Sequence, residues 1–206
     1  MSTLKVDAIQ TRGSASGTIS CAGQISEAGK EYFHVDLTTA QTGLVDAAKN
    51  VVDFGGSGTV KYDTKSNFDS ANDAYLLDSS NGVYLISYSI CITSDVVTTE
   101  TLIDVVGMIR VATNGSTFVG VQGGATHQQT DAGGEVGSYT VDGTFIYKST
   151  NATTKIQLLG LGQTTGGGTY EIQNNLANAV NTESATNLGT DGTSARPTFL
   201  TIVRIA

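Results

Sequence analysis

The chain has 206 residues, of which 39% are hydrophobic and 15% are charged, and its formal net charge is −8. This composition excludes a disordered chain, which would carry more charge and less apolar surface. An acidic chain without a Lys/Arg cluster is also a poor partner for nucleic acid. The 25 Gly, the single Pro and the abundant Thr favour many short strands, because Thr suits strands and Gly permits tight turns.

Residues 1–50 are expected to form an extended N-terminal arm. Leu4, Val6 and Ala8 alternate with polar residues, which is typical of a short strand. An arm of this size buries its own apolar side chains poorly. We therefore expect Leu4, Val6 and Ile9 to anchor the arm on a neighbouring subunit or on another surface.

Two further elements are predicted inside this arm. A strand is indicated by the alternation of Phe33, Val35 and Leu37 with polar residues. The other element is one short helix of two to three turns, predicted by apolar residues at helical spacing. These residues are Leu44, Ala47, Ala48, Val51 and Val52.

Residues 51–206 predict an all-β domain, which is either a β-sandwich or a jelly roll. About eight strands are expected, because short alternating segments are separated by Gly, Asn and Asp turns. Asn114-Gly115 predicts a hairpin turn. In the longest strand, the even-numbered residues from Tyr84 to Ile92 form one apolar face. The main predicted strands cover residues 60–62, 82–92, 105–112, 116–122, 139–148, 155–161 and 198–205.

Three segments are expected to be loops. Two of them are rich in Gly, at residues 123–124 and 166–168. The third is a polar segment at residues 174–197, which is long enough to carry a function.

No catalytic constellation emerges, so an enzyme is not expected. His34 and His127 each stand alone among polar residues, and the sequence lacks the motifs of serine hydrolases, zinc proteases and nucleotide-binding loops. Four carboxylates lie near one another in the sequence and could supply oxygen ligands for calcium, but their spacing does not match the twelve-residue calcium loop. We expect no cofactor and no metal. The four carboxylates are Asp63, Asp69, Asp73 and Asp78.

The two cysteines, Cys21 and Cys91, are too few for a disulfide framework, although one bridge between them is possible. Cys91 lies in an apolar run and is expected in the core. The first residues lack the apolar segment of a signal peptide, and no run is long enough for a membrane span. We therefore expect synthesis in a cytoplasm and no membrane partner. Asn114 and Asn151 each begin an N-glycosylation motif, but glycosylation requires export, so we interpret both motifs as chance matches.

One stretch resembles a known family. Residues 60–64, Asn67-Phe68-Asp69 and residues 82–88 resemble the jelly roll of complement globular heads and tumour-necrosis-factor-like proteins, which has a Phe-Asp after its first strand and a Gly-x-Tyr opening the next inner strand. The closing strand at residues 198–205 matches the one that runs beside the first in that family. The chain departs from the family at residues 151–154, where a Gly-Asp is usual.

This resemblance implies a homotrimer that assembles through the outer face of one sheet. The aromatic candidates for that interface are Tyr62, Tyr88, Tyr147 and Phe199. The sequence leaves open whether each ring faces the interface or the core of its own subunit.

The first ten residues are similar to the starts of virion proteins of tailed phages, especially cyanophages. The two resemblances together imply a virion structural protein made in the host cytoplasm. One reading is a trimeric capsid decoration (cement) protein, with the major capsid protein or other virion proteins as partners. The alternative is a tail or head fibre that binds a host surface receptor through residues 123–135 and 163–197. A polysaccharide-degrading enzyme would need paired carboxylates, and no pair stands out.

Overall fold

The computed structural model describes residues 31–94, 102–129, 138–164, 166–174 and 198–206. Residues Glu31–Ala206 form one compact unit. The described elements, in chain order, are β1 (Tyr32–Leu37), β2 (Gln41–Val45), β3 (Asn50–Val51), α2 (Phe54–Ser57), β4 (Gly58–Asp63), β5 (Phe68–Asp69), β6 (Ala74–Leu76), β7 (Val83–Ser94), β8 (Leu102–Ala112), β9 (Val119–Gln129), β10 (Ser138–Lys148), β11 (Lys155–Thr164), β12 (Thr169–Ile172) and β13 (Phe199–Arg204).

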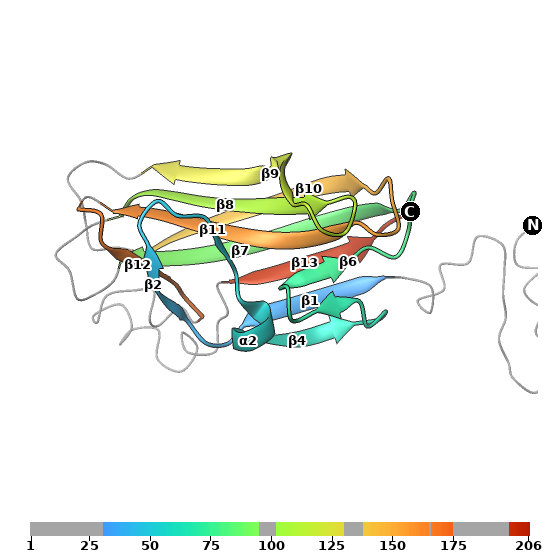
Figure 1. Cartoon of the computed structure of the whole chain (residues 1–206), viewed down its shortest axis with the longest axis horizontal. Helices are drawn as coiled ribbons and strands as arrows, with labels where there is room; N and C mark the ends of the chain where they lie inside the picture. The colour runs from blue at the N-terminus through green and yellow to red at the C-terminus, as the bar shows by residue number, and fades with distance from the viewer. Residues whose placement is uncertain (1–30, 95–101, 130–137, 165, 175–197) are drawn as a thin grey trace, which may run out of the picture. The chain divides into compact units, whose positions relative to one another are not determined.

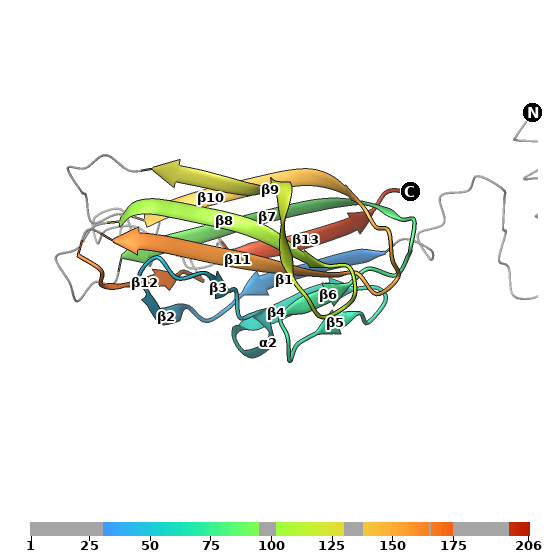
Figure 2. The same ribbon diagram turned by 45° about the horizontal axis from the view of Figure 1, so that its top comes forward.

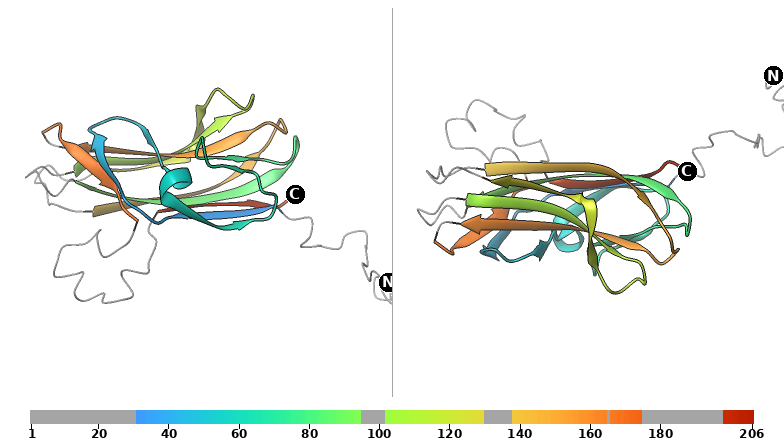
Figure 3. Two further views of the ribbon diagram at one scale, coloured as in Figure 1. Left: turned by 60° about the horizontal axis from the view of Figure 1, so that its bottom comes forward. Right: turned by 90° about the horizontal axis from the view of Figure 1, so that it is seen from above.

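These strands form two antiparallel sheets packed face to face (Figures 1 and 3). The first sheet has the order β2-β12-β7-β13-β1-β4, and β10 pairs with β7 beside this path. The second sheet has the order β5-β6-β11-β8-β9, and β3 pairs with β11. Some neighbours are consecutive in the chain, such as β8 and β9, whereas others, such as β1 and β13, come from its two ends. The predicted all-β jelly-roll class is confirmed.

The predicted apolar face of the longest strand is confirmed. Tyr84, Ile86, Tyr88, Ile90 and Ile92 alternate along β7, and each is at most 1% exposed. They point into the space between the sheets, because successive side chains of a strand point to opposite faces. The predicted hairpin is also present, since β8 pairs with β9 across a turn in which Gly115 has a φ of +77°.

Residues 31–50 belong to the sandwich, which corrects the expected arm boundary at residue 50. β1 lies between β13 and β4 in the first sheet, and Phe33, Val35 and Leu37 are fully buried. The closing strand β13 therefore runs beside β1, and not beside the strand at residues 60–62, which is part of β4. Residues 1–30 lie outside the described residues.

The helix predicted over residues 44–52 is wrong. Residues 41–45 form β2, which pairs with β12, and β3 pairs with β11. Between them, Ala47 has a φ of +52°, which a helix does not allow. The conformation of residues 41–51 is decided by pairing with β12 and β11, which are far away in the sequence. The local spacing of apolar residues gives no information about these partners. A single helical turn instead begins after Asp53, whose carboxylate accepts a hydrogen bond from the amide of Gly56 (2.7 Å).

One of the two Gly-rich segments expected as loops lies in a sheet, and the other is a turn, as predicted. Gly123 and Gly124 lie within β9, so this pair does not form a loop. β12 follows the Gly-rich turn at residues 166–168 and inserts between β2 and β7. Its Tyr170 and Ile172 are fully buried, so a strand that the sequence did not reveal contributes to the core.

A buried carboxyl group ties the start of β1 to its surroundings. Glu31 is fully buried, and its carboxylate accepts hydrogen bonds from the hydroxyl of Tyr84 (2.8 Å) and from the amide of Asp78 (3.2 Å). Its backbone carbonyl accepts a third from the amide of Arg204 (2.9 Å). Burial raises the pKa of Glu31, because a charged carboxylate is costly away from water. The nearby Asp78 adds to this effect through its negative charge, while the hydrogen bonds oppose it.

The raised pKa of Glu31 predicts how Glu31→Gln changes stability with pH. A carboxyl with a raised folded-state pKa stabilises the fold at pH values below its unfolded pKa, and it loses this contribution as the pH rises through the folded value. The stability of the Gln variant relative to wild type should therefore increase as the pH rises above the ordinary range of carboxyl titration. Urea unfolding at a series of pH values measures the difference, and Asp142→Asn, at an exposed position on β10, is the control. A difference that is constant with pH would contradict the prediction.

Candidate self-association face

The outer face of the first sheet is the side turned away from the second sheet. It is formed by β4, β1, β13, β7 and β10, which lie side by side in that order. Because Phe33 and Leu200 point into the core, their neighbours along β1 and β13 point outward. The outward side chains can therefore be assigned from the register of the strands.

One rung of this face is apolar across four strands. Tyr32 lies opposite Val203, Val203 lies opposite Leu85, and Leu85 lies opposite Ile146. Directly opposed residues of antiparallel strands have their Cβ atoms about 4.5–5.5 Å apart, so these side chains form a continuous strip. Tyr32 is 41% exposed and Ile146 is 65% exposed in the protomer.

Tyr62 on β4 extends this strip at one end. Its side chain is 62% exposed, and its ring meets that of Tyr32 edge to face, with the ring centres 6.1 Å apart. This is a favoured arrangement of two aromatic rings. The name "apolar row" is used below for Tyr62, Tyr32, Val203, Leu85 and Ile146.

The next rung contains one histidine, and most of its other side chains carry hydroxyl groups. His34 lies opposite Tyr62 on one side and Thr201 on the other, and its Nδ1 is 2.6 Å from the Thr201 hydroxyl oxygen. Further along the same rung, Thr144 donates a hydrogen bond to the hydroxyl of Ser87 (3.1 Å). The rung therefore presents small hydroxyl groups beside the apolar row.

An ionic cluster lies beyond His34. The Nε2 of His34 is 2.9 Å from one carboxylate oxygen of Asp36, and the Nζ of Lys61 is 4.0 Å from the other. The ring of Phe199 lies 5.7 Å from that of His34, centre to centre. The face thus combines exposed apolar side chains with the paired charges of Asp36 and Lys61.

The four aromatic interface candidates divide between this face and the core. Tyr62 is on the face, and Phe199 lies on its outer side, partly buried. Tyr147 packs against the core from β10. Tyr88 is 1% exposed, and its hydroxyl donates to the carbonyl of Gly107 (2.9 Å), so it is a core residue and its assignment to an interface is corrected. Its even position in β7 already placed it with the inward side chains.

Four members of the apolar row were missed from the sequence: Tyr32, Leu85, Ile146 and Val203. The odd positions of β7 read as the polar side of the strand, because Leu85 is followed by Ser87 and Ser89. The row exists only across strands, so no single segment shows it. The expected anchoring residues Leu4, Val6 and Ile9 lie outside the described residues.

Solved structures share this architecture. No protein-family model matches the chain, and no curated protein matches it. The chain is similar to Eiger TNF from S. frugiperda, with a TM-score of 0.54 and 10% identity over 86% of this chain and 93% of that one. It is also similar to murine APRIL at pH 5.0, with a TM-score of 0.50 and 8% identity over 85% of this chain and 99% of that one. The chain has the tumour-necrosis-factor-like jelly-roll fold. At these identities the likeness shows the fold alone.

The four carboxylates considered as calcium ligands, Asp63, Asp69, Asp73 and Asp78, have separate partners in this jelly roll. The carboxylate of Asp63 accepts hydrogen bonds from the backbone amides of residues 65, 67 and 68, whereas Asp69 pairs with Lys155 (2.9 Å). Asp73 accepts from the amide of Gly55 (2.6 Å), and Asp78 is 3.4 Å from the Nζ of Lys65. Within the described ranges, no group of three His, Cys, Asp or Glu side chains could hold a metal ion.

The cysteine, the sequon asparagine and the second histidine named in the sequence analysis do not form a reactive site among the described residues. Cys91 is a free thiol whose pKa is raised to about 11 by burial, which leaves it unreactive at neutral pH, and Cys21 lies outside the described residues. The side chain of Asn114 accepts hydrogen bonds from the amides of Ser116 and Thr117 and so supports its turn. His127 lies opposite Val106 in the second sheet.

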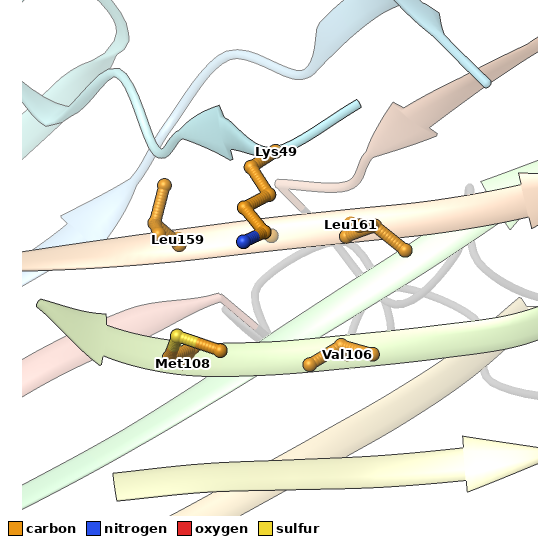
Figure 4. Close-up of a pocket in the computed structure, with 6 residues that line it drawn as sticks. Lys49, Val106, Met108, Leu159 and Leu161 are labelled. Carbon is orange, nitrogen blue, oxygen red and sulfur yellow. The ribbon is translucent and has the colours of Figure 1, made fainter. Parts of the chain in front are cut away.

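The second sheet carries a shallow apolar hollow on its outer face (Figure 4). Val106 and Met108 of β8 lie opposite Leu161 and Leu159 of β11, and the side chain of Lys49 extends across β11 from the segment before β3. The hollow has about 220 Å³ of free space, part of it continuous with solvent. Apart from Lys49, the side chains that line it are apolar. Among the described residues, no helix has the length and hydrophobicity needed to cross a membrane.

Proposed function

We propose that the protein is a non-enzymatic structural protein that assembles as a homotrimer and serves as a capsid decoration (cement) protein of a tailed-phage head. The apolar row on the outer face of the first sheet carries the assembly part of this proposal. Tyr32, Tyr62 and Ile146 are large, are 41–65% exposed, and lie on one continuous surface. Clustered exposed aromatic and aliphatic side chains mark protein–protein contacts more reliably than scattered ones.

The occupant of this face in the proposal is another copy of the chain. The family resemblance implies that assembly through the outer face of one sheet generates a trimer, and the first sheet carries the aromatic side chains that obligate interfaces favour. The charges near the row support the same occupant. Asp36 is already paired with His34 and Lys61, so a second copy covers the face without leaving these charges unpartnered.

The virion setting rests on the first ten residues, which are similar to the starts of phage virion proteins. In this proposal, residues 1–30, with Leu4, Val6 and Ile9, attach the trimer to the major capsid protein. The trimer adds contact area between capsomers and so stabilises the head against internal pressure. No active site is required for this role.

Assembly through the apolar row predicts that Ile146→Asp gives a monomer. The variant places a carboxylate at the β10 end of the apolar row, inside the proposed interface, where an unpaired buried charge costs several kcal/mol. Sedimentation velocity should show a trimer for wild type and a monomer for the variant at micromolar concentration. Val119→Asp is the matched control, because Val119 is 58% exposed on β9 of the second sheet, and it should leave the trimer intact. A monomeric wild type, or equal effects of both variants, would contradict the proposal.

The number of copies per particle separates the capsid role from the fibre role. A decoration protein is expected in hundreds of copies per virion, and its removal should lower the temperature at which heads release DNA. A fibre is expected in a few tens of copies at most, and blocking it should abolish adsorption. Gel densitometry of purified virions measures the number, and absence of the protein from virions would refute both roles.

A further inference from the structure

His34 is positioned so that protonation changes the charge of the proposed assembly face. Its side chain is 25% exposed in the protomer and lies between Tyr62 of β4 and Thr201 of β13, next to the apolar row. A second copy that covers the row would therefore also cover His34. Histidine is the side chain that ordinarily changes charge between about pH 5 and pH 8.

Both ring nitrogens of His34 have partners that tolerate either protonation state. The carboxylate of Asp36 accepts a hydrogen bond from Nε2 in both states (2.9 Å). The hydroxyl of Thr201, 2.6 Å from Nδ1, donates to the neutral ring and accepts from the protonated ring by rotating. Protonation therefore needs no rearrangement of the protomer, and its main effect is a change of charge.

The charges around His34 decide the sign of this effect. Asp36 on the same strand carries −1, and Lys61 on β4 carries +1. The neighbouring groups of Tyr62, Thr201 and Phe199 are uncharged, and Asp142 lies at the far end of the rung that holds Asp36 and Phe199. The cluster of His34, Asp36 and Lys61 is therefore neutral when His34 is neutral and has a net charge of +1 when it is protonated.

We propose that acid weakens self-association through protonation of His34, which lies on the assembly face next to the apolar row. This inference rests on the proposed function, because His34 acts only if its face is the one that a second copy covers. Burial of a neutral, internally paired cluster is tolerated, whereas burial of a cluster with an unbalanced charge is disfavoured. Assembly is then coupled to the release of a proton from each protomer, and neutral to alkaline pH favours the trimer.

The test is sedimentation equilibrium of the full chain at about pH 5.5 and about pH 8, on either side of the ordinary histidine titration. The association constant of wild type should be at least about tenfold lower at the acidic pH, which is a modest coupling between two binding events. In His34→Gln, the ratio of the two association constants should approach one, whatever the absolute affinity. His127→Gln, on β9 of the second sheet, should keep the wild-type ratio.

The outcomes distinguish this inference from the proposed function. A wild type that assembles equally at both pH values overturns the role of His34 and leaves the trimer standing. The same holds if His34→Gln retains the wild-type ratio, since another group would then be responsible. A chain that is monomeric at both pH values overturns the proposed function and, with it, the inference.

Discussion

Replacement of Phe33 by Ala is expected to lower the free energy of unfolding by about 3–5 kcal/mol, the range for removal of a buried aromatic ring. Phe33 is fully buried in β1, and its ring stacks on those of Tyr75 and Phe68, with centres 4.3 and 5.3 Å apart. The Ala variant loses the apolar contacts of the ring and leaves a cavity between the sheets. It should also release Tyr75, which packs on one face of the same ring.

Chemical denaturation at a fixed protein concentration measures this effect, because association shifts the apparent stability. Val45→Ala is the control within the same part of the chain, since Val45 is 65% exposed on β2. Its change should be within about 0.5 kcal/mol, as for most surface substitutions. A small effect of Phe33→Ala would show that residues 31–50 form an arm outside the cooperative core, as the sequence suggested.

Replacement of Gly143 by Ala is expected to destabilise the fold by about 1–3 kcal/mol, the usual cost of overpacking a core. A Cβ atom at Gly143 would lie 2.4 Å from Cε1 of Tyr88, which is far inside van der Waals contact. The ring cannot move away freely, because a Cβ at Gly107 would be only 2.8 Å from its other edge, and its hydroxyl is hydrogen-bonded to the carbonyl of Gly107. Gly143 therefore provides the space that the Tyr88 ring occupies.

A double-mutant cycle tests this explanation. Tyr88→Leu removes the ring, so Gly143→Ala should cost clearly less in that background than in wild type. Gly120→Ala is the matched control, because a Cβ there would meet only the Sδ of Met108, at the flexible end of a side chain. Additive effects of Gly143→Ala and Tyr88→Leu would rule out the contact as the cause.

Gly143 also illustrates what could be read from the sequence. The strand predicted over residues 139–148 is confirmed as β10, but its glycine is required by a tyrosine more than fifty positions earlier. Alternation within one strand is a local property, and it correctly identified the inward face of β7. The requirement for glycine depends on the packing of two strands, and a single sequence does not display it.

The same distinction explains the errors near the N-terminal end of the described chain. Phe33, Val35 and Leu37 were recognised as a strand, but the placement of that strand between β13 and β4 depends on partners far along the chain. The helical spacing from Leu44 to Val52 arose because Leu44 and Val52 both approach the core, one from β2 and one after β3. A period of 3.6 residues cannot be distinguished from two short strands joined by a turn when so few positions are available.

The candidate face was predicted only in part for the same reason. Tyr62 stood out as an aromatic residue in a strand, whereas Leu85 and Val203 gain significance from Tyr32 and Ile146, which flank them in the sheet. The family resemblance supplied the expectation of a self-association face. The register of the first sheet supplied its residues.

The antiparallel pairing of β1 with β13 also fixes where the described chain enters and leaves the sandwich. The amide of Arg204 donates a hydrogen bond to the carbonyl of Glu31 (2.9 Å), so Glu31 and the last residues lie at the same end of the fold (Figures 1 and 2). A short linker from Ala206 to Glu31 would therefore permit circular permutation, with new ends opened at the Asn114-Gly115 turn. A cargo domain fused after Ala206 would begin beside the attachment point of residues 1–30, which should be considered when the protein is used to display other proteins.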